Sequence, residues 1–192
     1  MLAPWRSPLA HALHRNRSLA YARFLQLATV RPDGRPANRT VVFRGFLDDT
    51  NQLKLITDIR SEKALQIPHC TWGEICWYFP KTREQLRLLG QLILVDAHHA
   101  DPALLKARKM QWHDLSDAAR LQFGWANPGQ PRDPADPFLP PPPDPHEPLP
   151  NFCLLLLDPV QVDHLELRGD PQNRFRYSMD EGDTWQVEPV NP

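Results

Sequence analysis

The chain has 192 residues, of which 41% are hydrophobic and 23% charged, as expected of a globular protein with a sizeable core. Its formal net charge of -1 provides no overall field for nucleic acid or an anionic membrane, so we expect neither partner. The three cysteines form no CxxC pair, which argues against disulfides and zinc and favours a cytoplasmic setting.

The first half of the chain alternates apolar, β-prone runs with turn sequences. The expected strands are Phe24–Val30, Pro36–Phe46, Gln52–Thr57, Thr71–Phe79 and Glu84–Val95. Gly90 indicates a bulge or bend in the last of them. A helix with a break near Asn16 is expected before them, over Pro8–Arg23. This pattern predicts antiparallel hairpins.

The second half adds helices, a proline-rich stretch and more strands. The expected helices are Glu62–Ile67 with Ser61 as N-cap, a helix that Asp101 and Pro102 start and that runs to Gln111, and Asp114–Phe123. Residues 127–150 hold 11 of the 22 prolines and are predicted to be a surface loop with polyproline II character. The later strands are Phe152–Leu157, Gln161–Leu167, Arg174–Met179 and Thr184–Val187. The fold class is therefore mainly β with peripheral helices, an antiparallel barrel in a single domain over residues 1–192.

One turn carries residues suited to an anion. Thr57 ends a strand, and Ser61 and Lys63 follow at a helix start, so hydroxyls, backbone N–H groups and an ammonium converge as they do around a phosphate. Plain N-capping by Ser61 is a compatible alternative. Arg39 and Arg44 lie five residues apart and would point to opposite faces of a regular strand, either as ligand contacts or as solvated charges.

Other chemistry finds no support in the sequence. No GxSxG, P-loop or HExxH motif occurs, and the pair His98-His99 has no third ligand at metal spacing. We therefore expect no metal, and no side chain is singled out as a catalytic acid or base. The aromatic residues of the strand Thr71–Phe79 are expected in the core or at an interface rather than stacked on a ligand.

Three motifs in order resemble the pyridoxamine 5'-phosphate oxidase-like family of FMN-binding split barrels, in its oxidase-related branch. They are Arg39–Arg44 for the family's Arg-x-Val-x-x-Lys strand, Ile56–Lys63 for its Tyr-Thr-x-x-x-Ser-Arg-Lys turn, and Glu84–Leu86 for its Arg-Gln-Val strand start. The resemblance is good over residues 24–90 and weak in the C-terminal strands. It implies an FMN-binding split β-barrel that forms a homodimer with FMN at the interface.

The resemblance also implies which residues contact FMN. Arg39 and Lys63 would hold the phosphate, with Thr57 and Ser61 helping.

At the ring, Thr40, Val41, Val42 and Phe43 would lie along the isoalloxazine, and Arg44 would replace the family's Lys near the reactive face. Gln85 would hydrogen-bond the flavin, and Arg174 would reach the flavin of the partner subunit.

The chain departs from the oxidase in ways that bear on its substrate. Glu62 replaces a phosphate-binding Arg, and Asp170–Arg174 lacks the Arg and His that engage the pyridoxal substrate. We expect Trp112–Ser116 and Phe123–Gly129, with the proline-rich loop, to cover the flavin and define another pocket.

The resemblance thus implies a flavin-dependent oxidoreductase that acts on an unidentified small molecule by hydride transfer at flavin N5. A non-catalytic protein that binds flavin, or a related tetrapyrrole or deazaflavin, is the alternative. Pyridoxamine 5'-phosphate oxidase activity itself is a third reading, which the departures disfavour.

Overall fold

An antiparallel sheet dominates the computed structural model, which describes residues 2–132, 134–135, 138 and 140–192. The strands are β1 (Phe24–Val30), β2 (Pro36–Val42), β3 (Leu53–Asp58), β4 (Trp72–Phe79), β5 (Glu84–Val95), β6 (Phe152–Glu166), β7 (Asn173–Met179) and β8 (Trp185–Val190). The helices are α1 (Arg6–Asn16), α2 (Glu62–Gln66), α3 (Pro102–His113) and α4 (Asp117–Leu121), with a 3-10 turn at Gln122–Gly124. The sheet order is β2-β1-β4-β5-β6-β7-β8, and β3 also pairs with β6.

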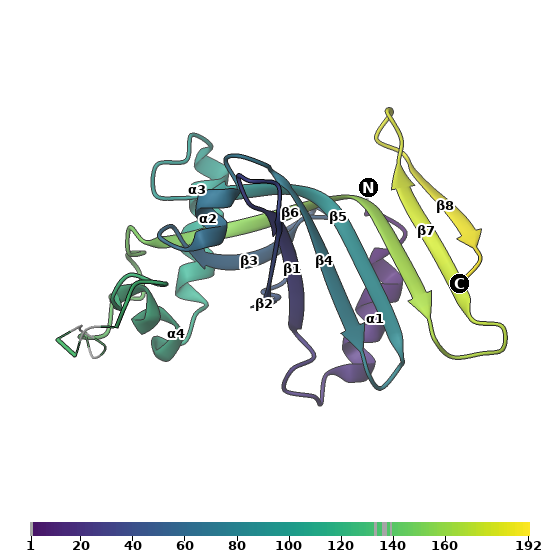
Figure 1. Ribbon diagram of the computed structural model, residues 1–192, viewed down its shortest axis with the longest axis horizontal. Coiled ribbons are helices and arrows are strands. Elements are labelled where there is room, and N and C mark those ends of the chain that lie inside the picture. Colours follow the sequence, from purple (N-terminus) through teal and green to yellow (C-terminus); the bar gives the residue numbers. More distant parts are fainter. Residues whose placement is uncertain (1, 133, 136–137, 139) are drawn as a thin grey trace.

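The long strand β6 splits the sheet into a barrel and a hairpin. Its first half pairs with β3 and its second half with β7, while β5 pairs with both halves. The chain after β2 bonds to β3, because the Arg44 amide donates to the Lys54 carbonyl (2.9 Å) and the Lys54 amide to the Gly45 carbonyl (2.8 Å). These bonds close β2-β1-β4-β5-β6-β3 into a barrel, and β7 and β8 leave it as a separate hairpin (Figure 1).

The predicted strand Pro36–Phe46 is too long, because β2 ends at Val42. Gly45 has a φ of 106°, a conformation that glycine adopts readily, and the backbone turns there from β1 towards β3. The barrel therefore closes at the point where the sequence suggested an uninterrupted strand.

The two predicted strands around Asp158 and Pro159 are one strand, so that prediction is wrong. The pairing register with β5 shifts between Leu89 and Gly90, where Leu89 faces Gln161 and Gly90 faces Pro159. A Cβ on Gly90 would lie 2.1 Å from the carbonyl oxygen of Asp158. The bulge expected at Gly90 is therefore present, and the space at this glycine lets β6 continue through a proline.

Two predicted helices are shorter in the structure. The first ends at Asn16, whose side chain donates to the Ala12 carbonyl (2.9 Å) and accepts from the Lys81 amide (2.9 Å) instead of continuing the helix to Arg23. The helix predicted over Asp114–Phe123 starts at Asp117, after a cap at Ser116. The Asp101 cap of α3 is confirmed, since its carboxylate accepts from the Ala103 amide at 2.8 Å.

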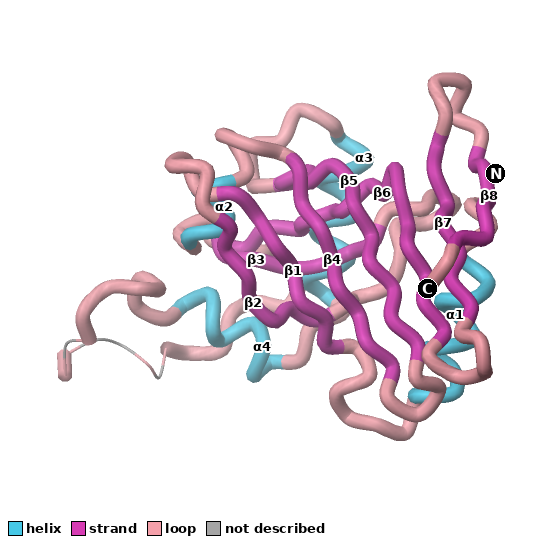
Figure 2. Tube along the Cα trace, turned by 45° about the vertical axis from the view of Figure 1, so that its right-hand side comes forward, coloured by secondary structure: helices cyan, strands magenta, loops and turns pink. Residues whose placement is uncertain are grey.

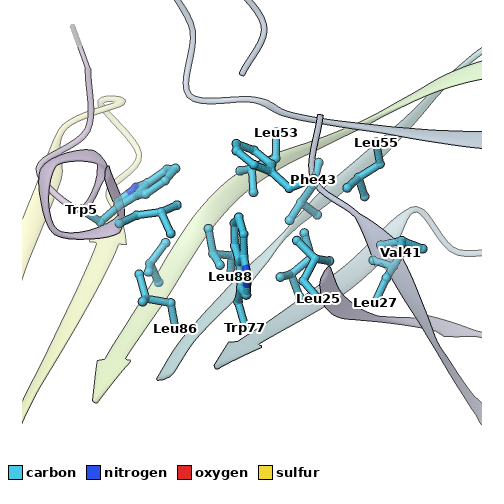
Figure 3. Packing of buried hydrophobic residues seen from close by; sticks show 14 of the residues in the cluster. Trp5, Leu25, Leu27, Val41, Phe43, Leu53, Leu55, Trp77, Leu86 and Leu88 are labelled. Carbon is cyan, nitrogen blue, oxygen red and sulfur yellow. The ribbon is translucent and has the colours of Figure 1, made fainter. Parts of the chain in front are cut away.

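The main core lies inside the barrel. Figure 3 shows apolar side chains of β1, β3, β4 and β5 facing one another, with Trp5, just before α1, at one end. Trp77 and Phe79 are fully buried, whereas Trp72 and Tyr78 on the same strand are 45% and 46% exposed. A smaller cluster of Trp112, Leu115, Phe123 and Phe152 packs α3 and the 3-10 turn against β6.

The helices lie at different ends of the sheet. In Figures 1 and 2, α2 and α4 lie at the end next to β3, and α1 lies towards the β7–β8 hairpin. The described part of residues 127–150 contains no helix or strand. Among the helices of the described residues, none combines the length and apolar character that a membrane crossing requires.

Candidate functional site

A cavity of about 610 Å³ opens where the end of β3 meets the α4 region. Its volume lies in the range of small-molecule sites. One side consists of Arg44 and the turn from Thr57 to Lys63. The other side comes from residues 122–130, called the wall segment below, together with Arg132 and Phe138.

The hydroxyls of the turn face the cavity side and each other. Thr57 Oγ1 and Ser61 Oγ are 2.9 Å apart, and Thr57 is only 3% exposed. Ser61 occupies the N-cap position of α2, but its side chain makes no capping bond. Plain capping therefore does not account for the Ser61 hydroxyl, which is free to serve a ligand.

The Lys63 ammonium is partly buried and has few partners to balance its charge. Its Nζ lies 3.4 Å from Ser61 Oγ, and within the described residues it has no carboxylate partner at ion-pair distance. Burial lowers the pKa of Lys63, and the nearby charge of Arg39 lowers it further, against a smaller opposing effect of Asp58. An anionic group here would gain a charge-assisted hydrogen bond and relieve this cost.

Arg44 is a second cation at the cavity without an acidic partner among the described residues. Its Nε is buried and has no hydrogen-bond partner in the part of the chain that the structure describes. Burial lowers the pKa of the Arg44 guanidinium, with a smaller contribution from Arg23. A buried, unpaired donor is costly, so this nitrogen is a natural contact for an acceptor on a bound molecule.

Arg39 does not line the cavity. Its guanidinium donates to Thr29 Oγ1 (2.6 Å), the Leu27 carbonyl (3.2 Å) and Gln66 Oε1 (3.2 Å). Its charge nevertheless influences Lys63 across a short gap. Its predicted contact with a phosphate stays a prediction.

The neighbouring residues of β2 also lie outside the cavity lining. Val41 is 9% exposed and packs in the barrel core, while Thr40 is exposed and Val42 half-buried on the opposite face. The Val41 side chain is thus unavailable to a ligand, which leaves only its backbone for the predicted flavin contact.

Gln85 and Arg174 belong to a different surface. In the strand register Tyr78 pairs with Gln85, Gln85 with Leu165, and Leu165 with Arg174, so the four form one row across β4 to β7. Arg174 makes two bonds to the Asp163 carboxylate, from Nε at 3.0 Å and from Nη2 at 2.8 Å. The structure therefore brings Arg44, Thr57, Ser61 and Lys63 together and leaves Gln85 and Arg174 apart from them.

The prediction that Trp112–Ser116 and Phe123–Gly129 define a pocket is confirmed for the second segment only. Phe123 and Trp125 to Gly129 line the cavity as anticipated, but Trp112 lies in the small core and its Nε1 donates to the Asp144 carbonyl at 2.8 Å. Trp125 and Phe138 meet edge to face with ring centroids 6.0 Å apart, and Arg132 lies over the Phe138 ring. The cavity thus has an aromatic side opposite its cationic turn.

Asp58 and Arg60 are site residues that the sequence reasoning missed. Arg60 makes a bidentate pair with Asp58, with distances of 2.9 Å from Nε and 2.7 Å from Nη2. The same guanidinium bonds to the wall segment. The sequence does show Asp58 and Arg60 two residues apart in a turn, which could have suggested an ion pair. The partners of Arg60 in the wall segment, however, come near it only in the folded chain.

A second polar cluster lies elsewhere, under α1. Glu84, His164 and Glu166 have potential ligand atoms within 4.8 Å of one another. His164 Nε2 is 3.0 Å from Glu84 Oε2, and Glu166 accepts from Asn173 at 3.1 Å. The partners of these groups are thus protein side chains, and we assign no metal to the cluster.

Comparison with known proteins defines the class. The family model of the FMN-binding domain of pyridoxamine 5'-phosphate oxidase matches residues 2–96. A crystal structure of a pyridoxamine 5'-phosphate oxidase-related, FMN binding protein from Nostoc punctiforme PCC 73102 is 64% identical over the full length of both chains, with a TM-score of 0.97. The fold is thus that of the FMN-binding split barrels.

A curated relative extends the match over the whole chain. The pyridoxine/pyridoxamine 5'-phosphate oxidase 2 of Arabidopsis thaliana is 39% identical over 195 residues, covering 100% of this chain and 98% of the relative. PhzG from Burkholderia lata 383, solved with tetrahydrophenazine-1-carboxylic acid, shares the fold at 19% identity and a TM-score of 0.76, covering 98% of this chain and 90% of that one. The chain belongs to the pyridoxamine 5'-phosphate oxidase-like family of FMN-binding proteins, and FMN is its cofactor.

The cavity's own chemistry fits this cofactor. Lys63, the two hydroxyls beside it and the unpaired Nε of Arg44 suit phosphate and carbonyl oxygens. Trp125 and Phe138 suit a flat ring system.

Proposed function

We propose that the protein is an FMN-dependent oxidoreductase that acts on a small molecule, with hydride transfer at flavin N5 as the chemistry that the cofactor supplies. One observation carries the proposal: a cationic, hydroxyl-bearing turn and an aromatic wall share one cavity of about 610 Å³ in a chain of an FMN-binding family. A flavin-binding protein without turnover would use the same turn and wall, so reduction of the bound flavin separates the two functions.

In this proposal Lys63, Ser61 and Thr57 bind the FMN phosphate. Arg44 lies on the same cavity and supplies positive charge near the ring, where it would stabilise the reduced, anionic flavin or orient an anionic substrate. Arg39 supports the site through its field on Lys63.

The cavity also favours a kind of substrate. Trp125 and Phe138 offer aromatic surface, and Arg132 and Arg44 offer cations. A flat, partly apolar molecule with an anionic substituent would use both features.

We also propose a homodimer in which each FMN contacts both chains. Gln85 and Arg174 lie in one row with Tyr78, on a face where Phe24 and Trp72 are also 47% and 45% exposed. A two-fold axis would bring this face of one subunit towards the cavity of its partner. Tyr78→Asp should therefore convert a dimer into monomers in light-scattering chromatography and weaken FMN binding; a dimer that persists would contradict this arrangement.

A cytoplasmic location is part of the proposal. Cys70, Cys76 and Cys153 are all free thiols in the structure, as is usual in a reducing compartment. Fractionation of cells that produce the tagged protein would test it.

Pyridoxamine 5'-phosphate oxidase activity is a second candidate, favoured by the name of the Arabidopsis relative. In this structure Arg108 is 6% exposed and donates to the carbonyls of Phe152 and Leu149. Arg120 is equally buried, and its side chain bonds to the Leu115 carbonyl and to Asp117. Both arginines are thus occupied by structural bonds and are not free to bind a substrate phosphate. This supports a substrate other than pyridoxamine 5'-phosphate.

The test begins with the purified protein. A flavin absorption spectrum and release of FMN would establish the loaded form, and anaerobic reduction by NADH or NADPH followed by reoxidation would establish turnover of electrons. FMN that neither a nicotinamide donor nor a candidate substrate reduces would refute the enzyme and leave a binding protein. Formation of pyridoxal 5'-phosphate and peroxide from pyridoxamine 5'-phosphate would select the second candidate instead.

A further inference from the structure

Arg60 connects the turn at Lys63 to the wall segment through a fully used guanidinium. Nε and one N–H of Nη2 bond to Asp58 at 2.9 and 2.7 Å. Nη1 donates to the Trp125 carbonyl at 3.0 Å and to Asn127 Oδ1 at 3.1 Å, and Nη2 also donates to the Phe123 carbonyl at 3.3 Å. These contacts engage all five N–H donors that an arginine has.

The part of the wall segment that follows Phe123 is bonded to the barrel through the Arg60 side chain. Phe123 itself is anchored in the small core and accepts a further bond from Asn151 at 3.2 Å. For Trp125 and Asn127, by contrast, the bonds to Arg60 are the hydrogen bonds to the barrel that the described residues provide. Asn127 is exposed, and Trp125 is 37% exposed with its ring against Phe138, a residue of the loop and not of the barrel.

The other end of the link is rigid. The Asp58 and Arg60 side chains are only 15% and 23% exposed, and the Arg60 amide also donates to Asp58 Oδ1 at 2.8 Å. Arg60 is followed directly by Ser61, so a movement of the hydroxyl-bearing turn moves the guanidinium and the wall together. The planar guanidinium of Arg60 fixes both the direction and the distance of its acceptors, whereas a lysine ammonium fixes only the distance.

We propose that Arg60 is a positioning residue that holds the aromatic wall against the turn that binds the FMN phosphate, so that FMN binding and wall placement strengthen each other. The inference rests on the proposed function for the phosphate turn. Because linkage is reciprocal, a variant that frees the wall must also weaken FMN binding.

Two measurements on the purified full-length chain test the proposal. The first is the rate of chymotrypsin cleavage after Trp125 in flavin-free protein, with cleavage at other aromatic residues as an internal reference. The second is the dissociation constant for FMN, from quenching of flavin fluorescence. Arg60→Gln removes the charge and the planar fork of donors, and Arg60→Lys removes only the fork. Arg35→Gln is the matched control, because it removes an arginine that likewise pairs with an aspartate two residues away, Asp33 (2.8 Å), and lies outside the cavity lining.

We expect both Arg60 variants to be cleaved at least tenfold faster after Trp125 and to bind FMN about tenfold more weakly, while the Arg35 variant matches the wild type. Wild-type values for Arg60→Lys would show that charge alone matters and would overturn the proposal. Wild-type cleavage and affinity in Arg60→Gln would overturn it as well.

Asn127→Ala keeps the test valid if an Arg60 variant fails to fold, because Asn127 is exposed. In the wild-type background it should speed cleavage after Trp125 and weaken FMN binding about threefold, and wild-type values for both would contradict the link. Where Arg60→Gln folds, Asn127→Ala should have no effect beside it; equal effects in both backgrounds would contradict the link as well. A wild-type chain that binds no FMN would refute the proposed function and the coupling together, whereas the cleavage rates would still decide whether Arg60 fixes the wall.

Discussion

Lys63→Met should weaken FMN binding and, at the same time, stabilise the flavin-free protein. The Lys63 ammonium has one neutral partner, Ser61 Oγ at 3.4 Å, and burial and the charge of Arg39 both lower its pKa. A phosphate would be its strong partner. Hydrogen bonds to charged groups contribute about 1.5–3 kcal/mol, which corresponds to an increase of about 10- to 150-fold in the dissociation constant for FMN.

The stability effect has the opposite sign and depends on pH. A lysine whose pKa is lowered by folding destabilises the native state while it stays charged. This cost is present below the lowered pKa and disappears as the pH rises towards the ordinary value of 10.5. The wild-type chain without flavin should therefore gain stability over this alkaline window, and Lys63→Met should be more stable at pH 7 and lack that gain.

Titration with FMN and urea unfolding of the flavin-free protein measure the two effects. Lys106→Met is the matched control, because this lysine is exposed on α3, away from the cavity. The reasoning is refuted if Lys63→Met keeps wild-type affinity for FMN, or if it lowers the unfolding free energy of the flavin-free chain while the control does not.

Three further predictions concern stability. Gly90→Ala should cost about 3 kcal/mol in urea unfolding, because its Cβ would meet the backbone of Asp158 at 2.1 Å; a cost below about 1 kcal/mol would contradict the rigid bulge. Arg108→Met should cost about 2–4 kcal/mol, since the Phe152 carbonyl loses two buried bonds from the guanidinium and the Leu149 carbonyl loses one, and an unchanged midpoint would refute that. A hydrogen bond from His164, the largest effect, lowers the pKa of Glu84 below its ordinary 4.5, so stability present above pH 4.5 is lost as the pH falls through the lowered pKa; Glu84→Gln should flatten this acid limb, and an unchanged acid limb would contradict it.

Local sequence rules predicted much of the barrel. Strands such as Phe24–Val30 and Glu84–Val95 have the predicted bounds, because alternating burial leaves a clear pattern in half-buried strands. The rules failed where a partner decides the outcome. β6 continues through Pro159 because Gly90 on the facing strand leaves room, and no local pattern contains that fact.

The site was predictable in part for the same reason. Thr57, Ser61 and Lys63 are close in sequence, so one turn brings them together. The acceptors of Arg60 in the wall segment lie 63 to 67 residues away, and only the packing of α4 against β6 and β3 brings them to it. Gln85 and Arg174 were predicted only from the resemblance to the family motifs. In a single chain they lie outside the cavity.

Glu62 shows how a departure from the family motif can be compensated in space. By sequence it replaces a phosphate-binding arginine and lowers the positive charge of the turn. In the structure its carboxylate pairs with Arg31 at 3.0 Å and does not line the cavity. Arg44 and Arg132 supply cations at the cavity from outside the turn. In the proposed FMN site, the positive charge therefore comes from the end of β2 and from the segment next to the wall, as well as from Lys63. A count of cations along the motif misses Arg44 and Arg132, because these two residues lie 88 positions apart in the sequence.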